Sequence, residues 1–317
     1  MKGLELSEQF FKAHEQEIKD LLKEDIHKVS MGLCGQGSEC FGFDDEISRD
    51  HDFGPGFCIF LDDEMEEKHG EVLRQFYEGR PKEFMDLSRN PSFHGQNRVG
   101  VINTREFYFA SLSLDEVPKN PFQWYQLSEE RLAMATNGRI FHEGEDLFME
   151  MRRVFQAFYP KDVVLKKLAS RFAVMAQAGQ YNYGRCLHRG DMVASQLALS
   201  LFLKNAMSAL YLLHGRYMPF YKWSFRGLKA WMEDQNLPML LEALAVSHKG
   251  VALVPFGADQ VKEYEAAVLI EALCGEIAKL AVEKGYLKET VAFLEDGVLP
   301  LQEQIEDPLL KKLPLEQ

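Results

Sequence analysis

The stretch Gly35-Gln36-Gly37-Ser38-Glu39-Cys40-Phe41-Gly42 is a turn rich in small residues between two predicted strands. It follows the alternating apolar run of residues 29–34 and precedes the apolar run of residues 56–61. Glycines let backbone N–H groups approach a phosphate closely, and the N-terminus of a following helix favours negative charge. The order of strand, Gly-Ser turn and second strand therefore predicts a phosphate-binding turn at Gly37 and Ser38.

Asp50 and Asp52 stand two residues apart in the segment that leads into the second predicted strand. Alternate residues of a strand point to the same side and lie roughly 6–7 Å apart. Both carboxylates are therefore expected to point to one place in front of the sheet. Because Mg²⁺ is held by one or two carboxylates together with substrate phosphates, this pair predicts a Mg²⁺ site. A second interpretation stays open, in which residues 44–52 form an acidic surface loop.

The combination of Gly37-Ser38 with Asp50-His51-Asp52 resembles the signature of the DNA polymerase β-type nucleotidyltransferase superfamily, which includes the aminoglycoside nucleotidyltransferases. The resemblance implies transfer of a nucleoside monophosphate from an NTP, with ATP as the expected co-substrate, to an acceptor, and release of pyrophosphate. Asp50 and Asp52 would then be catalytic residues that bind Mg²⁺. Gly37 and Ser38 would hold the phosphates.

The second half of the chain resembles a bacterial family that carries a domain of unknown function 4037 beside a nucleotidyltransferase-like half. The resemblance runs from about residue 30 to about residue 235. It implies a polymerase β-like fold with a helical substrate domain, and it supplies no known acceptor. It rests on the strings Tyr159-Pro160-Lys161-Asp162-Val163, Arg189-Gly190-Asp191 and Arg216-Tyr217-Met218-Pro219-Phe220-Tyr221-Lys222-Trp223, together with Arg185.

Three charged residues of the helical half are candidates for the site. Arg185 and Lys222 are predicted to pair with phosphate, and Asp191 to receive an amine or a hydroxyl of the acceptor. Plainer interpretations stay open beside these roles. Arg185 and Asp191 would equally suit an ion pair at a helix end, and Lys222 would suit a solvated position after Pro219.

The third carboxylate that many superfamily members carry on a later strand is missing at the expected place. The strand to align is Val99-Gly100-Val101, which has glycine at the acidic position. Asp86, Glu106 or Asp191 could supply the acid instead. This departure keeps open a nucleotide-binding module without turnover, beside transfer to a small molecule and nucleotidylation of a protein hydroxyl.

Composition narrows the classes of partner. The formal net charge of −13 argues against a non-specific grip on nucleic acid, which depends on Lys and Arg neutralising phosphates. It is compatible with an amine-bearing acceptor, a protein partner or a homodimer. The chain has no apolar run of 18 residues and no signal-peptide pattern, so no membrane association is expected. The five scattered cysteines form no Cys-x-x-Cys pair, which indicates a reducing cytoplasm.

The distribution of helix and strand patterns predicts an α+β chain of two domains. Residues 1–145 combine strand and helix patterns, which predicts a nucleotidyltransferase-like domain with a mixed sheet and helices. Residues 146–317 show long helical periods, which predicts an all-α helical bundle that binds substrate or partner. Thr104 is the predicted N-cap of a helix that follows a strand at residues 98–102. The proline-rich tail after residue 299 is expected to wrap or fray.

Overall fold

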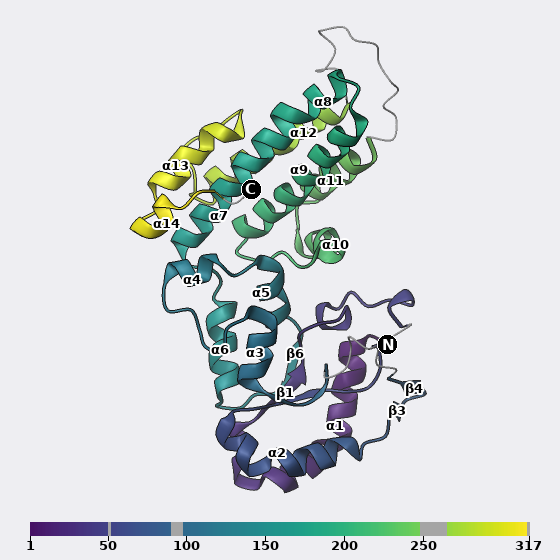
Figure 1. Cartoon of the computed structure of the whole chain (residues 1–317). Helices are drawn as coiled ribbons and strands as arrows, with labels where there is room; N and C mark the ends of the chain where they lie inside the picture. The colour runs from purple at the N-terminus through teal and green to yellow at the C-terminus, as the bar shows by residue number, and fades with distance from the viewer. Residues whose placement is uncertain (50–51, 90–97, 248–264, 316–317) are drawn as a thin grey trace. The chain divides into compact units, whose positions relative to one another are not determined.

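A computed structural model of the whole chain describes residues 1–49, 52–89, 98–247 and 265–315 (Figure 1). The fold is α+β, as predicted: a small mixed sheet with helices is followed by a long all-helical part. Internal contacts divide the chain into two compact units. Unit 1 consists of Met1–Pro118 and Leu127–Phe158, and unit 2 of Lys119–Gln126 and Tyr159–Gln317.

Unit 1 carries all the strands of the described chain. Its elements are α1 (Gly3–Leu22), η1 (Lys23–Lys28), β1 (Ser30–Leu33), η2 (Glu39–Phe41), η3 (Ile47–Arg49), β2 (Cys58–Leu61), α2 (Asp63–Glu78), β3 (Glu83–Phe84), β4 (Leu87–Ser88), β5 (Gly100–Asn103), α3 (Thr104–Leu112), α5 (Glu129–Thr136), β6 (Arg139–His142) and α6 (Leu147–Gln156).

The main sheet has four strands in the order β5-β2-β1-β6. The central strand β1 is antiparallel to both of its neighbours, β2 and β6. The edge strand β5 is parallel to β2. The sheet is therefore mixed, and the strand predicted at residues 98–102 is confirmed as β5. The remaining strands, β3 and β4, form a separate hairpin.

Alternating side chains of β2 divide the core of unit 1 into two layers. Ile59 and Leu61 belong to a buried cluster with α1 and α2, which lie on one face of the sheet (Figure 1). Phe60 points to the other face, where its ring stacks on Phe148 of α6 at 3.7 Å between centroids. Tyr108 of α3 also contacts Phe148. Because strand side chains alternate between faces, one short strand anchors helices on both sides.

Helix α6 explains why unit 1 ends later than residue 145, the predicted boundary. Its buried residues Phe148 and Phe155 pack on Tyr108, so the helix completes the core of the sheet. Asp146 caps α6 by accepting a hydrogen bond from the Met149 N–H at 2.9 Å. The helical periodicity that begins here was expected to mark the second domain, but periodicity alone does not reveal which core a helix joins.

The start of α3 lies one residue earlier than predicted. Asn103, the last residue of β5, is the N-cap, and its side chain accepts hydrogen bonds from the backbone N–H groups of Arg105 and Glu106. Thr104 is already the first residue of the helix. The prediction of Thr104 as the cap was therefore wrong. Asparagine is at least as good a cap as threonine, and here strand and helix follow each other directly.

All regular elements in the described residues of unit 2 are helices. Its elements are α4 (Pro121–Tyr125), α7 (Lys161–Met175), the π-helix η5 (Ala176–Tyr183), α8 (Gly184–His188), α9 (Met192–Leu213), α10 (Tyr221–Trp231), α11 (Asn236–Ser247), α12 (Glu265–Glu283), η8 (Leu294–Gly297), α13 (Val298–Glu303) and α14 (Pro308–Lys312).

Helices α7 and α9 form the centre of unit 2. Gly179 in η5 lies directly against the ring of Phe202 in α9, where an added Cβ would be 2.3 Å from a ring carbon. A glycine at this position lets the two helices approach closely. The tail wraps onto α7: the Asp162 carboxylate accepts backbone hydrogen bonds from Glu306 at 3.1 Å and Asp307 at 2.7 Å.

Helix α9 is long and apolar enough to cross a membrane by length and composition. Its most apolar window has a mean hydropathy of 1.3, and 56% of that window is buried inside the structure. The core helix of a globular bundle meets the same criteria, and α9 packs against α7, α10 and α12. The feature is therefore weak grounds for a membrane span.

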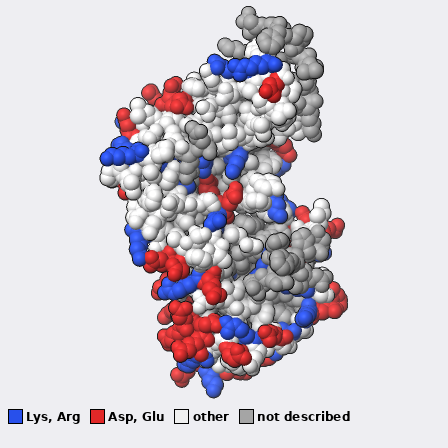
Figure 2. All heavy atoms as spheres, viewed as in Figure 1, with Lys and Arg blue, Asp and Glu red and all other residues white. Residues whose placement is uncertain are grey.

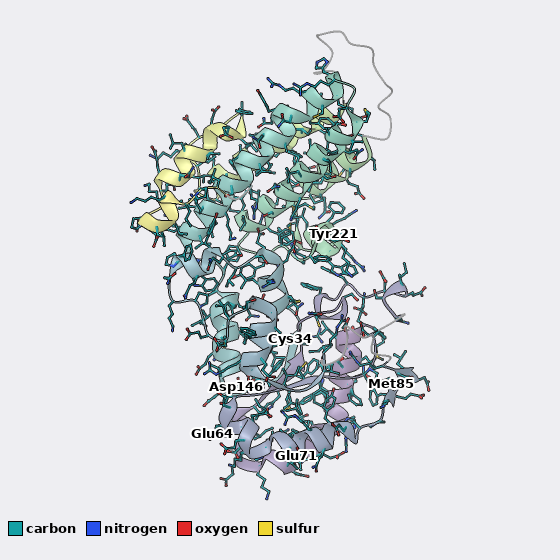
Figure 3. All side chains as sticks on the ribbon, in the orientation of Figure 1. Cys34, Glu64, Glu71, Met85, Asp146 and Tyr221 are labelled. Carbon is teal, nitrogen blue, oxygen red and sulfur yellow. The ribbon has the colours of Figure 1, made fainter. Side chains whose placement is uncertain are left out.

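Charged side chains are mixed on the face of the molecule seen in Figure 2, where acidic residues gather at the lower end. That end includes α2, on which Figure 3 labels Glu64 and Glu71. Glu64 belongs to the acidic first turn of this helix. On the described part of this face, basic residues are scattered among acidic and uncharged ones and form no continuous patch.

Candidate functional site

One edge of the four-stranded sheet gathers the segments that the sequence singles out. Gly32, near the end of β1, pairs with Cys58 at the start of β2, and Cys58 pairs with Gly100 at the start of β5. Leu33 pairs with Arg139 at the start of β6. The segment after β1 and those before β2, β5 and β6 therefore meet at the same edge, where Cys34, labelled in Figure 3, directly follows β1.

The Gly-Ser turn leaves β1 at this edge in a conformation that only glycine adopts readily. Gly35 and Gly37 have φ values of +103° and +124°. Ser38 precedes η2, and its carbonyl accepts hydrogen bonds from the N–H groups of Phe41 and Phe43. A long helix does not follow, because η2 spans only Glu39–Phe41. The expected helix N-terminus behind Ser38 is thus reduced to a single 3₁₀ turn.

Both ends of the turn are held by the Asn-Gly pair that precedes β6. The Asn137 side chain accepts a hydrogen bond from the Gly35 N–H at 2.8 Å and donates one to the Gly35 carbonyl at 2.8 Å. The Gly138 N–H donates to the carbonyl of Cys40 at 2.8 Å. Since Asn137 and Gly138 are adjacent, one short segment fixes the entry and the exit of the turn.

The buried guanidinium of Arg152 contacts the Asn137–Gly138 segment that holds the turn. Arg152 of α6 is 4% exposed, and its Nη2 donates to the backbone carbonyl of Asn137 at 2.6 Å. Its Nη1 is buried without a hydrogen-bond partner in the described part of the chain. Burial raises the pKa of the nearby Cys34 thiol to about 12, and the Arg152 charge offsets part of that rise. Sequence reasoning missed Asn137 and Arg152, although an Asn-Gly pair is a recognised turn signal.

Asp52 lies at the same edge, before β2. It is 3% exposed, and its carboxylate lies 3.5 Å from Nη2 of Arg98, the residue two positions before β5. Asp50 falls outside the described residues, so its predicted convergence with Asp52 on one point stays a prediction. Asp52 itself is in a bend with φ of +59° and not in a strand, because β2 begins only at Cys58. The strand-alternation argument for Asp52 was therefore wrong.

The loop from Asp52 to β2 is fixed by a second arginine. Arg89, which follows the β3–β4 hairpin, donates from Nε to the Pro55 carbonyl at 3.3 Å and from Nη2 to the Gly54 carbonyl at 3.1 Å. Gly54 has φ of +144° and lies directly against the Arg89 backbone, where a Cβ would be 2.6 Å from Arg89 Cα. These contacts fix the backbone two to three residues after Asp52.

Glu39 places a second buried carboxylate beside the turn. The residue is 5% exposed, and an added Cβ on Gly37 would lie 2.6–2.7 Å from its carboxylate atoms. Burial raises the pKa of Glu39, and its own backbone N–H and the charges of Arg89 and Arg98 offset part of that rise. Arg98 is thus electrostatically linked to Glu39 and to Asp52.

The third carboxylate is not supplied by the β5 strand. Gly100 has φ of +115° and pairs with Cys58. Asp86 is exposed at the turn of the β3–β4 hairpin, and Glu106 is exposed in the first turn of α3. Within the described residues, no group of three or more His, Cys, Asp or Glu side chains is arranged to hold a metal ion.

The three predicted site residues of unit 2 have local roles in the structure. Asp191 caps α9 by accepting a hydrogen bond from the Ala194 N–H at 3.0 Å. The Arg185 guanidinium stacks over the Tyr181 ring at 3.6 Å, and Lys222 lies over the Trp223 ring at 5.3 Å. An ion pair between Arg185 and Asp191 is not formed, so that alternative was wrong. Their roles toward phosphate and acceptor stay predictions.

Comparison with known proteins bears on both halves of the predicted resemblance. Residues 124–224 match the family model described as Domain of unknown function (DUF4037). The predicted resemblance to that family is confirmed over this segment, which includes the Tyr159-Pro160, Arg189-Gly190-Asp191 and Tyr221-Lys222-Trp223 strings. No curated protein matches the chain.

A similar solved structure is that of a nucleotidyltransferase-like protein from Exiguobacterium sibiricum 255-15. It is 11% identical, with a TM-score of 0.36, and the match covers 88% of this chain and 78% of that one. A similarity of this size assigns no substrate, metal or reaction to the present chain.

Proposed function

We propose that this protein is a Mg²⁺-dependent nucleotidyltransferase that transfers a nucleoside monophosphate from an NTP, ATP above all, to a small-molecule acceptor. The observation that carries the proposal is the buried Asp52 carboxylate at the sheet edge where the Gly37–Ser38 turn also lies. Catalysis of phosphoryl-type transfer rests on positioning and charge neutralisation more than on covalent work by the protein. A fixed turn and a fixed acid suit that task.

The donor set fits Mg²⁺, which prefers oxygen ligands and keeps substrate phosphates in its coordination shell. Asp52 supplies a buried carboxylate, and Asp50 is the proposed second ligand. When bound, the metal would neutralise charge on the transferring phosphate and the departing pyrophosphate. The residues of the chain do the positioning: Asn137 and Gly138 fix the turn, and Arg89 fixes the backbone after Asp52.

Gly37 and Ser38 are proposed to receive the phosphates through backbone N–H groups, since glycine has no Cβ to keep a phosphate away from the backbone. Arg98 is a further cation at the same edge for phosphate oxygens. Arg185 and Lys222 are proposed to bind the nucleotide phosphates as well, and Asp191 to bind the acceptor. The five free cysteine thiols suit the proposed cytoplasmic location, where thiols stay reduced.

Incubation with labelled ATP, GTP, CTP and UTP, Mg²⁺ and a pool of acceptors tests the proposal. The expected result is Mg²⁺-dependent release of pyrophosphate. Asp52→Asn should reduce it by more than the ~10–100-fold that loss of an outer-shell partner costs a metal site. Asp44→Asn is the matched control, because Asp44 is equally buried in unit 1 but binds the Gly3 N–H at 2.9 Å.

The alternatives give different results in the same experiment. Label that migrates with protein on a denaturing gel indicates nucleotidylation of a protein hydroxyl. Nucleotide binding without release of pyrophosphate under any condition indicates a binding module, which the glycine at position 100 specifically favours. Equal activity of Asp52→Asn and the wild type would contradict the proposed site.

A further inference from the structure

Within the described residues, the buried Glu39 carboxylate has its own backbone N–H as its hydrogen-bond partner. The residue is 5% exposed, and within the described residues it forms no hydrogen bond to another residue and no ion pair. Its Cβ lies against α1, where an added Cβ on Gly3 would be 2.5 Å away, and its carboxylate lies against Gly37. The side chain therefore folds back over the turn and not out into solvent.

This position is costly for the folded state. A buried charge loses its hydration, and a hydrogen bond to its own backbone N–H returns only part of that free energy. Arg89 and Arg98 stabilise the charged form of Glu39 from beyond ion-pair distance, and Arg98 lies 3.5 Å from Asp52. Another buried acid of unit 1, Asp44, instead accepts a hydrogen bond from the Gly3 N–H. Glu39 therefore depends on its own backbone N–H and on more distant charges, whereas Asp44 accepts a hydrogen bond from another residue.

A phosphate at Gly37 would meet the Glu39 carboxylate at once, because that carboxylate lies against Gly37. Two negative groups repel each other in a poorly hydrated site unless a cation lies between them. A divalent cation with oxygen ligands removes the repulsion by binding both the carboxylate and the phosphate. Without the metal, the Glu39 carboxylate would repel the phosphate, and Arg98 would be the nearby positive charge.

We propose that Glu39 is the third carboxylate of the transferase site, a metal ligand alongside Asp52 that takes the place of the acid missing at Gly100. This inference rests on the proposed function. It places the third acid directly after the Gly-Ser turn and not on the later strand. The exposed positions of Asp86 and Glu106 leave those acids without comparable contact to the turn.

The test compares Glu39→Gln with the wild-type full-length chain in two binding experiments and one stability experiment. Free Mn²⁺ measured by electron paramagnetic resonance in the presence of ATP reports metal affinity. ATP binding in the presence of EDTA reports metal-free affinity, and thermal melting reports stability. Asp44→Asn is the matched control for loss of a buried carboxylate in the same unit.

A metal ligand and a structural acid predict opposite outcomes. As a metal ligand, Glu39→Gln weakens Mn²⁺ binding in the ATP complex by about 10-fold or more, judged from the loss that outer-shell changes already cause. The same change leaves metal-free ATP binding equal or tighter and raises the melting temperature, because a buried charge that forms no ion pair within the described residues is gone. Asp44→Asn lowers the melting temperature and leaves Mn²⁺ binding unchanged.

Two results overturn the inference, and they are distinguishable. If the wild type binds ATP and Mn²⁺ together and Glu39→Gln binds Mn²⁺ equally well, Glu39 is not a ligand while the proposed function stands. If the wild type binds no ATP with Mn²⁺, the proposed function fails and Glu39 with it. Glu39→Asp keeps the charge, so Mn²⁺ affinity closer to the wild type than in Glu39→Gln supports the inference even if the glutamine variant folds poorly.

Discussion

The sheet edge of unit 1 and the helical unit 2 both place charged residues beside glycines, but they keep those charges in different surroundings. At the sheet edge, Glu39, Asp52 and Arg152 are each at most 5% exposed. In unit 2, the charged candidates Arg185 and Asp191 are exposed, and each has a local structural role.

The difference teaches where to look for function. A buried charge destabilises the folded state, so a chain keeps it only where the charge has a function or is well paired. An exposed ion or cap costs nearly nothing to keep. The sheet edge is therefore the stronger candidate for chemistry, and the motifs of unit 2 are explained first by helix ends and aromatic contacts.

The largest expected difference between the regions concerns two glycines with similar backbone conformations. Gly138 at the sheet edge has φ of +76°, and a Cβ there would lie 2.0 Å from the Leu33 carbonyl oxygen. Gly190 in unit 2 has φ of +68° with nothing within 4 Å. Gly190→Ala should cost only the ~1–2 kcal/mol of left-handed strain. Gly138→Ala should cost more, because backbone must also move.

Urea unfolding of both variants measures this difference. Gly138→Ala should in addition weaken ATP binding, since Gly138 holds the exit of the turn through Cys40. Equal destabilisation by the two substitutions would show that the sheet edge is packed no more closely than the helix end of unit 2. That result would contradict the proposed difference between the two regions.

A smaller effect is expected for two asparagines, the half-buried Asn137 and the buried Asn205. Asn137→Ala removes two hydrogen bonds to Gly35, and Asn205→Ala removes one hydrogen bond to the Leu201 carbonyl within α9. At ~1 kcal/mol for each bond, Asn137→Ala should lower the free energy of unfolding by about 2 kcal/mol and Asn205→Ala by about 1 kcal/mol.

ATP affinity distinguishes the Asn137→Ala and Asn205→Ala variants further. ATP affinity should fall in Asn137→Ala, because the entry of the phosphate-binding turn is released, and should stay unchanged in Asn205→Ala. Titration of both variants with ATP and Mg²⁺ checks the expectation. An unchanged ATP affinity in Asn137→Ala would mean that the two Asn137–Gly35 hydrogen bonds contribute to stability alone.

The smallest effect is expected at Asp191 of unit 2. Asp191→Ala should cost ~1 kcal/mol through loss of the α9 cap, and Asp191→Asn should cost almost nothing, because asparagine caps equally well. Thermal melting separates the two variants. If Asp191→Asn keeps its stability but loses pyrophosphate release, Asp191 takes part in the transfer. Unit 2 would then contribute to the chemistry, against the statement that its charged residues have structural roles.

Much of the fold follows from local sequence patterns. The alternating apolar run at residues 29–34 predicts β1, and the continuous apolar run at residues 56–61 predicts β2. The glycines at 35 and 37 predict a turn after β1, and both have positive φ. The boundary after residue 145 and the strand placement of Asp52 were less successful, since both depend on packing partners elsewhere in the chain.

The amino-acid sequence by itself determined the turn, the strands beside it and the long helices, because these depend on residues that are neighbours in the chain. Only the tertiary structure decided that Asn137 and Gly138 close the turn, that Arg98 meets Asp52, and that Glu39 is buried against Gly37. Asn137 and Gly35 are 102 positions apart, so no local pattern records their contact. The physical reason is that burial and charge pairing are properties of the folded core, which forms only when distant segments come together.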